Sequence, residues 1–269
     1  MTEGSVTSRD GTTIAFERTG SGRPLILVGS ALADRSDAAK LAALLAPDFT
    51  VVNYDRRGRG KSGDTQPYGV GRECEDIEAL VKEVGGAAAL FGSSSGAALA
   101  LAAAASGVGV DALALFEPPF VVQEGDRRPP ADLGSRVDEL VATGRPGKAV
   151  NAFMTEAIGM PAIAVRLMRL MPRTWAKLEA MAPTIRYDLT IMAGTQDGGA
   201  LPRERWASVA APTLVLDGGK SPAGMRHAAS ALADVLPNAR HRTVEGVSHG
   251  AVVMAPKKLA PLLREFFRA

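Results

Sequence analysis

The pentapeptide Gly92-Ser93-Ser94-Ser95-Gly96 is the segment best suited to carry chemistry. An apolar run at 87–91 precedes it and an alanine- and leucine-rich segment follows it, so it is predicted to turn a strand into a helix. Glycines two positions on either side of Ser94 remove side chains that would collide in such a sharp turn. The Ser94 hydroxyl is then exposed at the carboxyl end of the strand, beside the positive end of a helix, as a nucleophile requires.

Activation of a serine hydroxyl requires a general base, and His249 is placed to provide it. Of the other two histidines, His227 falls inside a predicted helix and His241 opens a predicted strand, which are positions typical of surface or packing side chains. His249 follows the last predicted strand, 240–244, through a loop that contains glycine. The chain order serine, acid, histidine suits a triad in which His249 acts first as base and then as acid.

Three segments resemble motifs of the α/β-hydrolase superfamily, in a region that runs from about Gly11 to the end of the chain. The loop 55–62, Asp-x-Arg-Gly-x-Gly-x-Ser, resembles the loop after the fourth strand of that family. Residues 92–96 resemble its nucleophile elbow, and 244–249 resemble its late histidine loop. The resemblance implies a serine hydrolase with eight strands and a cap inserted after the sixth strand.

The acid of the triad is predicted to be Glu117, with Asp217 as the alternative. The family usually carries this acid after its seventh strand, where Ser221 stands here, so the sequence departs from the pattern. Asp217 lies four residues earlier, at the end of the strand 212–216. Glu117 follows the strand 110–116, has the longer reach, and precedes two prolines that stiffen its loop. The Phe-Glu-Pro-Pro loop is also similar to the His-Glu-Leu-Pro-like loop of zearalenone-type lactonases, which favours Glu117.

Two backbone N–H groups must face the negative charge that develops on a carbonyl oxygen under attack. The first predicted donor is Ser95, directly after the nucleophile. The second is predicted in the loop after the third strand, at Ser30, with Ala31 as the alternative. The family often has His-Gly in this loop where the chain has Val28-Gly29. Because the donors are backbone groups, the absence of that histidine need not abolish function.

No cofactor and no metal is expected. Gly60-Lys61-Ser62 imitates the end of a phosphate-binding loop, but Asp55 stands where that loop needs its first glycine, so a solvated Arg/Lys loop is predicted instead. No His, Asp and Glu residues have metal-ligand spacing. The single cysteine, Cys74, excludes a cysteine-based zinc site within one chain. Its acidic neighbours predict an unreactive thiol, half-buried or on a helix surface.

Short apolar runs alternate with helical segments and predict the scaffold that positions these residues. Asp10-Gly11 predicts a hairpin between 5–9 and 13–18. Further strands are predicted at 24–28, 50–54, 87–91, 110–116, 212–216 and 240–244, and helices at 37–45, 72–84, 223–236 and 257–267. Apolar strands separated by helices predict an α/β fold with a mostly parallel sheet covered on both faces. This agrees with the eight-stranded sheet that the resemblance implies.

Residues 121–204 interrupt this alternation. They contain scattered proline and glycine and predicted helices at 133–141, 149–156, 163–170 and 175–181. We therefore predict an α/β-hydrolase core of residues 1–120 and 205–269 and a helical cap of residues 121–204. The cap is expected to contribute adaptable apolar pocket walls from its methionines and tryptophan, which are Met154, Met160, Met168, Met171, Met181 and Trp175.

Composition limits the partners that the chain is expected to have. The 269 residues, 46% of them hydrophobic, are enough to bury a sizeable core. A formal net charge of +2 predicts neither nucleic-acid binding nor a membrane anchor. The first six residues have no basic or apolar segment of the kind found in secretory signals. With one cysteine, a reducing, cytoplasmic location is expected, for a monomer or homodimer with a small-molecule ligand.

These features predict a serine hydrolase that cleaves a carboxylic ester or lactone of a fairly apolar small molecule through an acyl-enzyme on Ser94. Two alternatives stay open because fold does not fix function. One is another serine-dependent activity, such as carbon–carbon bond hydrolysis, perhydrolysis or a non-hydrolytic biosynthetic step. The other is a ligand-binding receptor without turnover. A serine nucleophile argues against the dehalogenase and epoxide-hydrolase chemistry that uses aspartate in this family.

Overall fold

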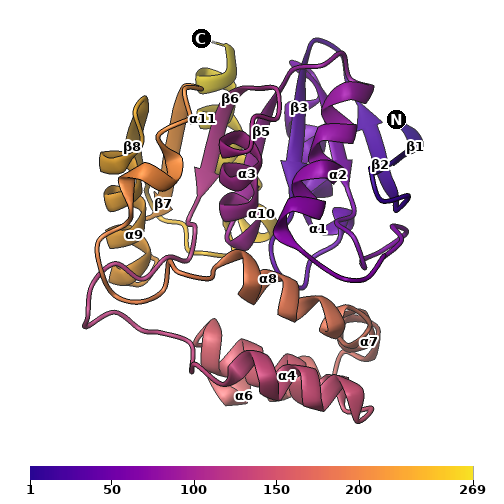
Figure 1. Ribbon diagram of the computed structural model, residues 1–269, viewed down its shortest axis with the longest axis vertical. Helices are drawn as coiled ribbons and strands as arrows, with labels where there is room; N and C mark the ends of the chain where they lie inside the picture. Colours follow the sequence, from indigo (N-terminus) through magenta and orange to yellow (C-terminus); the bar gives the residue numbers. More distant parts are fainter. Residues whose placement is uncertain (269) are drawn as a thin grey trace.

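The computed structural model describes residues 1–268, in which eight strands form one sheet (Figure 1). The strand order is β1-β2-β4-β3-β5-β6-β7-β8. Two strands at one edge pair in antiparallel fashion, β1 (Thr2–Thr7) and β2 (Thr13–Thr19). The other six run parallel, and they are β3 (Arg23–Val28), β4 (Phe49–Tyr54), β5 (Ala88–Ser93), β6 (Val110–Phe116), β7 (Thr213–Gly218) and β8 (Ala239–Val244). The predicted α/β fold is confirmed.

Helices cover both faces of the sheet, which explains why its central strands are mainly apolar. All six residues of β5 are buried. One face packs against α2 (Val70–Glu83), α3 (Ser95–Ala105) and α9 (Ala223–Val235). The other face packs against α1 (Arg35–Leu45), α10 (Ala251–Met254) and α11 (Pro256–Arg268). Each face therefore has its own apolar cluster, and the loops at the strand ends are free to carry polar groups.

A group of helices joins β6 to β7 and lies beyond the end of the sheet (Figure 1). Its members are α4 (Leu133–Ala142), α5 (Pro146–Ala152), the π-helical turn η1 (Phe153–Ala157), α6 (Ala162–Met168), α7 (Pro172–Met181) and α8 (Ile185–Ile191), with short 3-10 turns at Ala182–Thr184 and Arg203–Trp206. The helices and the turn at Ala182–Thr184 share an apolar cluster of their own, to which Leu32 of the core contributes. Trp206 belongs instead to the cluster of the core. Among residues 1–268, no helix combines the length and the apolar character that crossing a membrane requires.

Helix α8 was not among the predicted helices, and it joins the inserted helices to the core. Ile185 at its start belongs to the cluster of the inserted helices, whereas Ile191 and the following Met192 belong to the cluster beneath α2 and α3. In Figure 1, α8 lies between the sheet and α4. The helix is short, and its apolar residues face two different clusters, so it lacks the single apolar stripe by which a helix is recognised in a sequence.

The prediction that Cys74 is half-buried or on a helix surface is wrong, because the residue is buried in the cluster between α2 and the sheet. Burial raises the pKa of the Cys74 thiol to about 11. At pH 8 only about one thiol in a thousand is then ionised, against roughly a quarter of ordinary thiols with a pKa of about 8.5. We expect Ellman's reagent to react with the native protein at least ~100-fold more slowly than with the guanidinium-unfolded chain. Equal rates would contradict the buried position.

Candidate active site

Ser94 stands at the turn from β5 into α3 and has φ 55° and ψ −128°. A positive φ of this kind costs an L residue about 1–3 kcal/mol, and the surrounding structure must supply that energy. A Cβ atom on Gly92 would collide with the carbonyl oxygen of Gly96, and a Cβ atom on Gly96 with that of Val28. The sharp turn therefore depends on both glycines, as predicted, and it holds the serine at the end of β5.

The side chains of Ser94, His249 and Glu117 form a continuous chain of hydrogen bonds. His249 Nε2 lies 3.1 Å from Ser94 Oγ, and His249 Nδ1 lies 2.7 Å from Glu117 Oε2. A carboxylate can only accept a hydrogen bond, so it holds the imidazole hydrogen on Nδ1. The lone pair of Nε2 then faces the serine hydroxyl. The arrangement is suited to transfer of the hydroxyl proton from Ser94 to His249.

Glu117 is fully buried and lies one residue beyond β6. Its φ is 49°, which turns the chain over the end of the strand. Its Oε1 accepts a hydrogen bond of 2.7 Å from the N–H of Gly218, and its own N–H donates to the carbonyl oxygen of Leu216 at 2.9 Å. Both the backbone and the carboxylate of Glu117 are therefore fixed by β7, and the second carboxylate oxygen faces His249.

Asp217, the alternative acid, does not contact His249. It lies within β7, and its carboxylate pairs with His241 Nε2 and lies 3.4 Å from Thr243 Oγ1. Side chains inside a strand stand perpendicular to the sheet, so Asp217 cannot reach over the end of the strand as Glu117 does. The third histidine, His227, has Nδ1 3.1 Å from Asp126 Oδ1 and lies outside this chain of contacts.

Ser30, Ala31 and Ser95, which carry the predicted oxyanion donors, line the same cavity as Ser94 and His249. The loop that carries Ser30 and Ala31 continues through Leu32, whose φ is 52°. Within residues 1–268, Leu32, Ser94 and Glu117 are the three non-glycine residues with a positive φ. All three lie in the loops that meet at this cavity, and strained backbone of this kind clusters at functional sites.

The prediction of a solvated loop at 55–63 is wrong for its arginines. Arg56, Arg57 and Arg59 are buried, although Lys61 is exposed. A buried guanidinium requires a charged partner, and each arginine has one from another element. Arg57, for example, lies 2.7 Å from Asp76 of α2. The sequence does not reveal these partners because they are distant along the chain.

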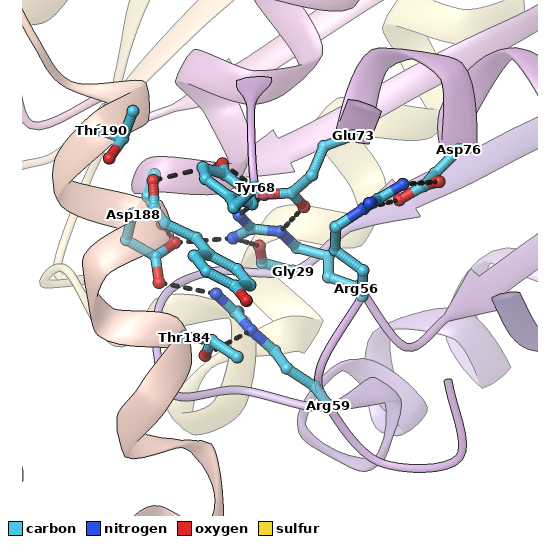
Figure 2. A network of polar contacts seen from close by, with 12 residues as sticks. Gly29, Arg56, Arg59, Tyr68, Glu73, Asp76, Thr184, Asp188 and Thr190 are labelled. Carbon is cyan, nitrogen blue, oxygen red and sulfur yellow. Dashed lines mark hydrogen bonds and ion pairs between the residues drawn. The ribbon is translucent and has the colours of Figure 1, made fainter. Parts of the chain in front are cut away.

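Arg56 and Arg59 converge on one carboxylate of α8, that of Asp188 (Figure 2). Arg56 Nη1 lies 2.7 Å from Asp188 Oδ1, and Arg59 Nη2 lies 2.6 Å from Oδ2. Ser95 Oγ also donates to Asp188 Oδ1, at 2.7 Å. Burial by itself raises the pKa of Asp188, but the charges of Arg59 and Arg56 outweigh it and hold the pKa below its usual value. Sequence reasoning missed Asp188, because no motif surrounds it.

Ser94 opens into a cavity of about 180 Å³. Its walls are mainly apolar and include Pro119, Phe153, Ile158, Leu189, Met192, Met225 and Val252. None of the six predicted methionine and tryptophan residues lines it: Met154 and Met181 are buried in the cluster of the inserted helices, and Met171 is exposed. That prediction is wrong because neighbouring residues of a helix point in different directions, so Phe153 reaches the cavity and Met154 does not.

Within the described part of the chain, no three His, Cys, Asp or Glu side chains are grouped so that they could hold a metal ion. The polar residues that line the cavity around Ser94 are Ser30, Ser93, Ser95, Asp188, Gln196 and His249. The candidate reactive groups of the site are the Ser94 hydroxyl and the His249 imidazole, which lie within hydrogen-bonding distance of each other.

Comparison with known proteins places the chain in a family. The family model described as alpha/beta hydrolase family matches residues 14–262. A crystal structure of an alpha/beta hydrolase from Sphaerobacter thermophilus DSM 20745 is 51% identical, with a TM-score of 0.90 over 98% of this chain and 100% of that chain. No protein of curated function matches the sequence significantly.

More distant structures share the fold. A thermophilic esterase from Thermogutta terrifontis is 22% identical, with a TM-score of 0.72 over 100% of this chain and 98% of that chain. An enol-lactonase from Burkholderia xenovorans LB400 is 19% identical, with a TM-score of 0.76 over 99% of this chain and 100% of that chain. The family match covers almost the whole sequence and agrees with the sheet, the elbow at Ser94 and the late histidine. The chain therefore belongs to the alpha/beta hydrolase family.

Proposed function

We propose that this protein is a serine hydrolase that cleaves small, uncharged carboxylic esters or lactones through an acyl-enzyme on Ser94. The observation that carries the proposal is the unbroken sequence of hydrogen bonds from Ser94 through His249 to Glu117, at the wall of an apolar cavity. A receptor without turnover has no need for a strained serine whose hydroxyl meets an oriented imidazole.

In the first half of the proposed reaction, His249 Nε2 takes the hydroxyl proton as Ser94 Oγ attacks the ester carbonyl carbon. The carbonyl oxygen becomes an oxyanion, stabilised by the backbone N–H groups of Ser95 and of Ser30 or Ala31. The imidazolium, held in place by Glu117, returns the proton to the leaving alkoxide oxygen. The C–O bond breaks, and the acyl group remains on Ser94.

In the second half, a water molecule takes the place of the alcohol. His249 removes one of its protons, the water oxygen attacks the acyl carbon, and the proton then passes to Ser94 Oγ as the acyl–serine bond breaks. The products are a carboxylic acid and an alcohol. With a lactone substrate both groups belong to one hydroxy acid.

The cavity suggests the size and the charge of the substrate. A volume of about 180 Å³ is close to the ~150 Å³ of a cavity that holds benzene and below the ~300–1,000 Å³ of pockets for drug-sized ligands. Among the described residues that line it, none is a lysine or arginine, and Asp188 already has its partners. A carboxylate on the acyl chain would be buried there without a counter-charge, which is costly.

We expect the specificity constant kcat/KM to fall at least ~10-fold from p-nitrophenyl butyrate to the decanoate. The matched p-nitrophenyl succinate monoester has the same four-carbon chain with a carboxylate at its end. Its kcat/KM should be about 100-fold lower than that of the butyrate. Five- and six-membered lactones should be opened, and macrocyclic lactones should not. Initial rates across this panel provide the measurement. A preference for the succinate or the decanoate would contradict the proposed substrate class, and no turnover of any ester or lactone would contradict the hydrolase itself.

A further inference from the structure

The loop that carries the second proposed oxyanion donor is held from behind by two buried arginines. Arg56 Nη1 donates to the carbonyl oxygen of Gly29 at 3.3 Å (Figure 2), and Arg59 Nη1 donates to that of Ser30 at 2.6 Å. A trans peptide is planar, and its C=O and N–H point in opposite directions. The carbonyl of Gly29 shares its peptide plane with the N–H of Ser30, and the carbonyl of Ser30 shares its plane with the N–H of Ala31. Arg56 and Arg59 therefore fix the directions of the two candidate donors.

The other proposed donor, the N–H of Ser95, is connected to the same two arginines. The Ser95 hydroxyl donates to Asp188 Oδ1, the atom that Arg56 also contacts. Asp188 Oδ2 contacts Arg59. A single carboxylate thus touches the residue after the nucleophile and both guanidinium groups behind the loop, and it is itself buried. No other described residue joins the two halves of the proposed oxyanion hole in this way.

Asp188 is contributed by α8 and not by the α/β core. The helix is anchored to the core by further contacts. Tyr187 stacks on Tyr68, with ring centroids 3.8 Å apart, and its hydroxyl donates to Asp64 at 2.6 Å. Arg59 Nε donates to Thr184 Oγ1 at 3.1 Å. The position of Asp188 therefore depends on α8 being seated on the loop that follows β4.

We propose that Asp188 is a positioning residue that aligns both sides of the oxyanion hole, so that the hole is complete only when α8 is docked against the core. The inference rests on the proposed function of Ser94. Asp188 does not touch the reacting atoms. It acts through Ser95 on one side and through Arg56 and Arg59 on the other.

The charges of the network explain why a carboxylate can stand so close to a site that stabilises a negative charge. Asp188 and Glu73 face Arg56, and Asp188 also faces Arg59, so two carboxylates balance two guanidinium groups. The positive groups lie on the carbonyl side of the loop peptides. There they polarise the peptide groups, which strengthens the N–H groups as donors on the opposite side.

The test compares the variant Asp188→Asn with Asp76→Asn, a matched control. Asp76 is equally buried and pairs with Arg57 of the same loop at 2.7 Å, but it contacts neither the Ser30 loop nor Ser95. Removal of one oxyanion donor lowers kcat about 10²–10³-fold, so we expect D188N to lose about 100-fold in kcat with KM little changed. D76N should stay within about threefold of the wild type, although both variants lose thermal stability.

Two further readouts separate positioning from a general loss of stability. The inhibition constant of a trifluoromethyl ketone, which forms an oxyanion on the serine, should rise in D188N by the same factor as kcat falls. Hydrogen exchange of the peptide that covers Gly29 to Ala33 should accelerate in D188N and not in D76N. Unchanged inhibition and unchanged exchange in D188N would overturn the proposal. Wild-type protein that turns over no ester would instead refute the proposed function, and the exchange rates would still decide whether Asp188 holds the loop.

If D188N does not fold, Arg56→Lys serves as the second variant. Lysine keeps the positive charge, but a single ammonium group cannot span Gly29, Glu73 and Asp188 as the guanidinium does. Compared with D188N, R56K should show smaller changes in the same direction: a lower kcat, a higher inhibition constant of the trifluoromethyl ketone and faster hydrogen exchange of the loop. Wild-type values for all three in R56K would overturn the proposal.

Discussion

Replacement of Ser94 by alanine should lower kcat for a p-nitrophenyl ester by about 10⁶-fold, the loss found when the nucleophile of a serine triad is removed. Alanine leaves the turn between β5 and α3 intact, because it adds no atom that could meet Gly92 or Gly96. The remaining rate would come from the oxyanion donors and the cavity. Steady-state kinetics, with the thermal melting temperature as a test of folding, provides the measurement.

Ser106→Ala is the control for this variant. Ser106 follows the opposite end of α3, and its hydroxyl donates to the carbonyl oxygen of Ala103 and has no contact with Ser94 or His249. A change at such a position should keep kcat within about twofold of the wild type. The S94A protein must be freshly purified and free of wild-type protein. If it then kept more than a hundredth of the wild-type kcat, Ser94 would not be the nucleophile.

Replacement of Glu117 by glutamine should lower kcat by about 10⁴-fold, as a carboxamide in place of the triad acid does elsewhere. The amide oxygen can still accept the N–H of Gly218, so the loop should stay in place. The amide NH₂ then faces His249 Nδ1, where the carboxylate oxygen lay at 2.7 Å. Nδ1 must become an acceptor, and the imidazole hydrogen moves to Nε2. An Nε2–H cannot take the proton of Ser94.

Asp217→Asn is the natural comparison for E117Q because Asp217 is a second buried acid on the neighbouring strand. Its partners are His241 and Thr243, and it shares none with Ser94. D217N should change kcat by no more than about threefold, even though it lowers thermal stability. If D217N were the slower of the two variants, the role of acid would pass to Asp217.

The sequence predicts the scaffold well because strands buried on both faces have a direct signature in apolar residues. The apolar runs at 24–28 and 110–116 correspond to β3 and β6 within one residue. The elbow is predictable for a similar reason. Glycine at 92 and at 96 is required by backbone contacts between neighbouring segments, so its spacing is visible in the chain.

The choice of acid could be narrowed but not decided by the sequence. Glu117 and Asp217 both lie at the carboxyl ends of adjacent strands. What separates them is where each strand ends and one backbone angle. β7 continues to Gly218 and keeps the backbone of Asp217 within the strand, whereas β6 ends at Phe116 and Glu117 turns with φ 49°. Strand ends and positive φ values of non-glycine residues have no reliable sequence signal.

The buried network was beyond prediction for a different reason. The arginines of the loop after β4 have the composition of a solvated segment, and only their partners make them buried. Asp188, which meets Arg56 and Arg59, comes more than a hundred residues later in a helix that was not predicted. Ion pairs between residues so far apart in the chain depend on how the inserted helices dock on the core. That docking cannot be inferred from the sequence alone.

The central claim, an acyl-transfer nucleophile at Ser94 activated by His249, is tested most directly by reaction with a fluorophosphonate followed by peptide mass spectrometry. We expect one adduct per chain, located on Ser94, in the wild type. The variants Ser94→Ala and His249→Ala should acquire none over the same time, because the first lacks the attacking oxygen and the second lacks the base 3.1 Å from it. An adduct on another residue, or undiminished labelling of Ser94 in the His249→Ala variant, would contradict the claim.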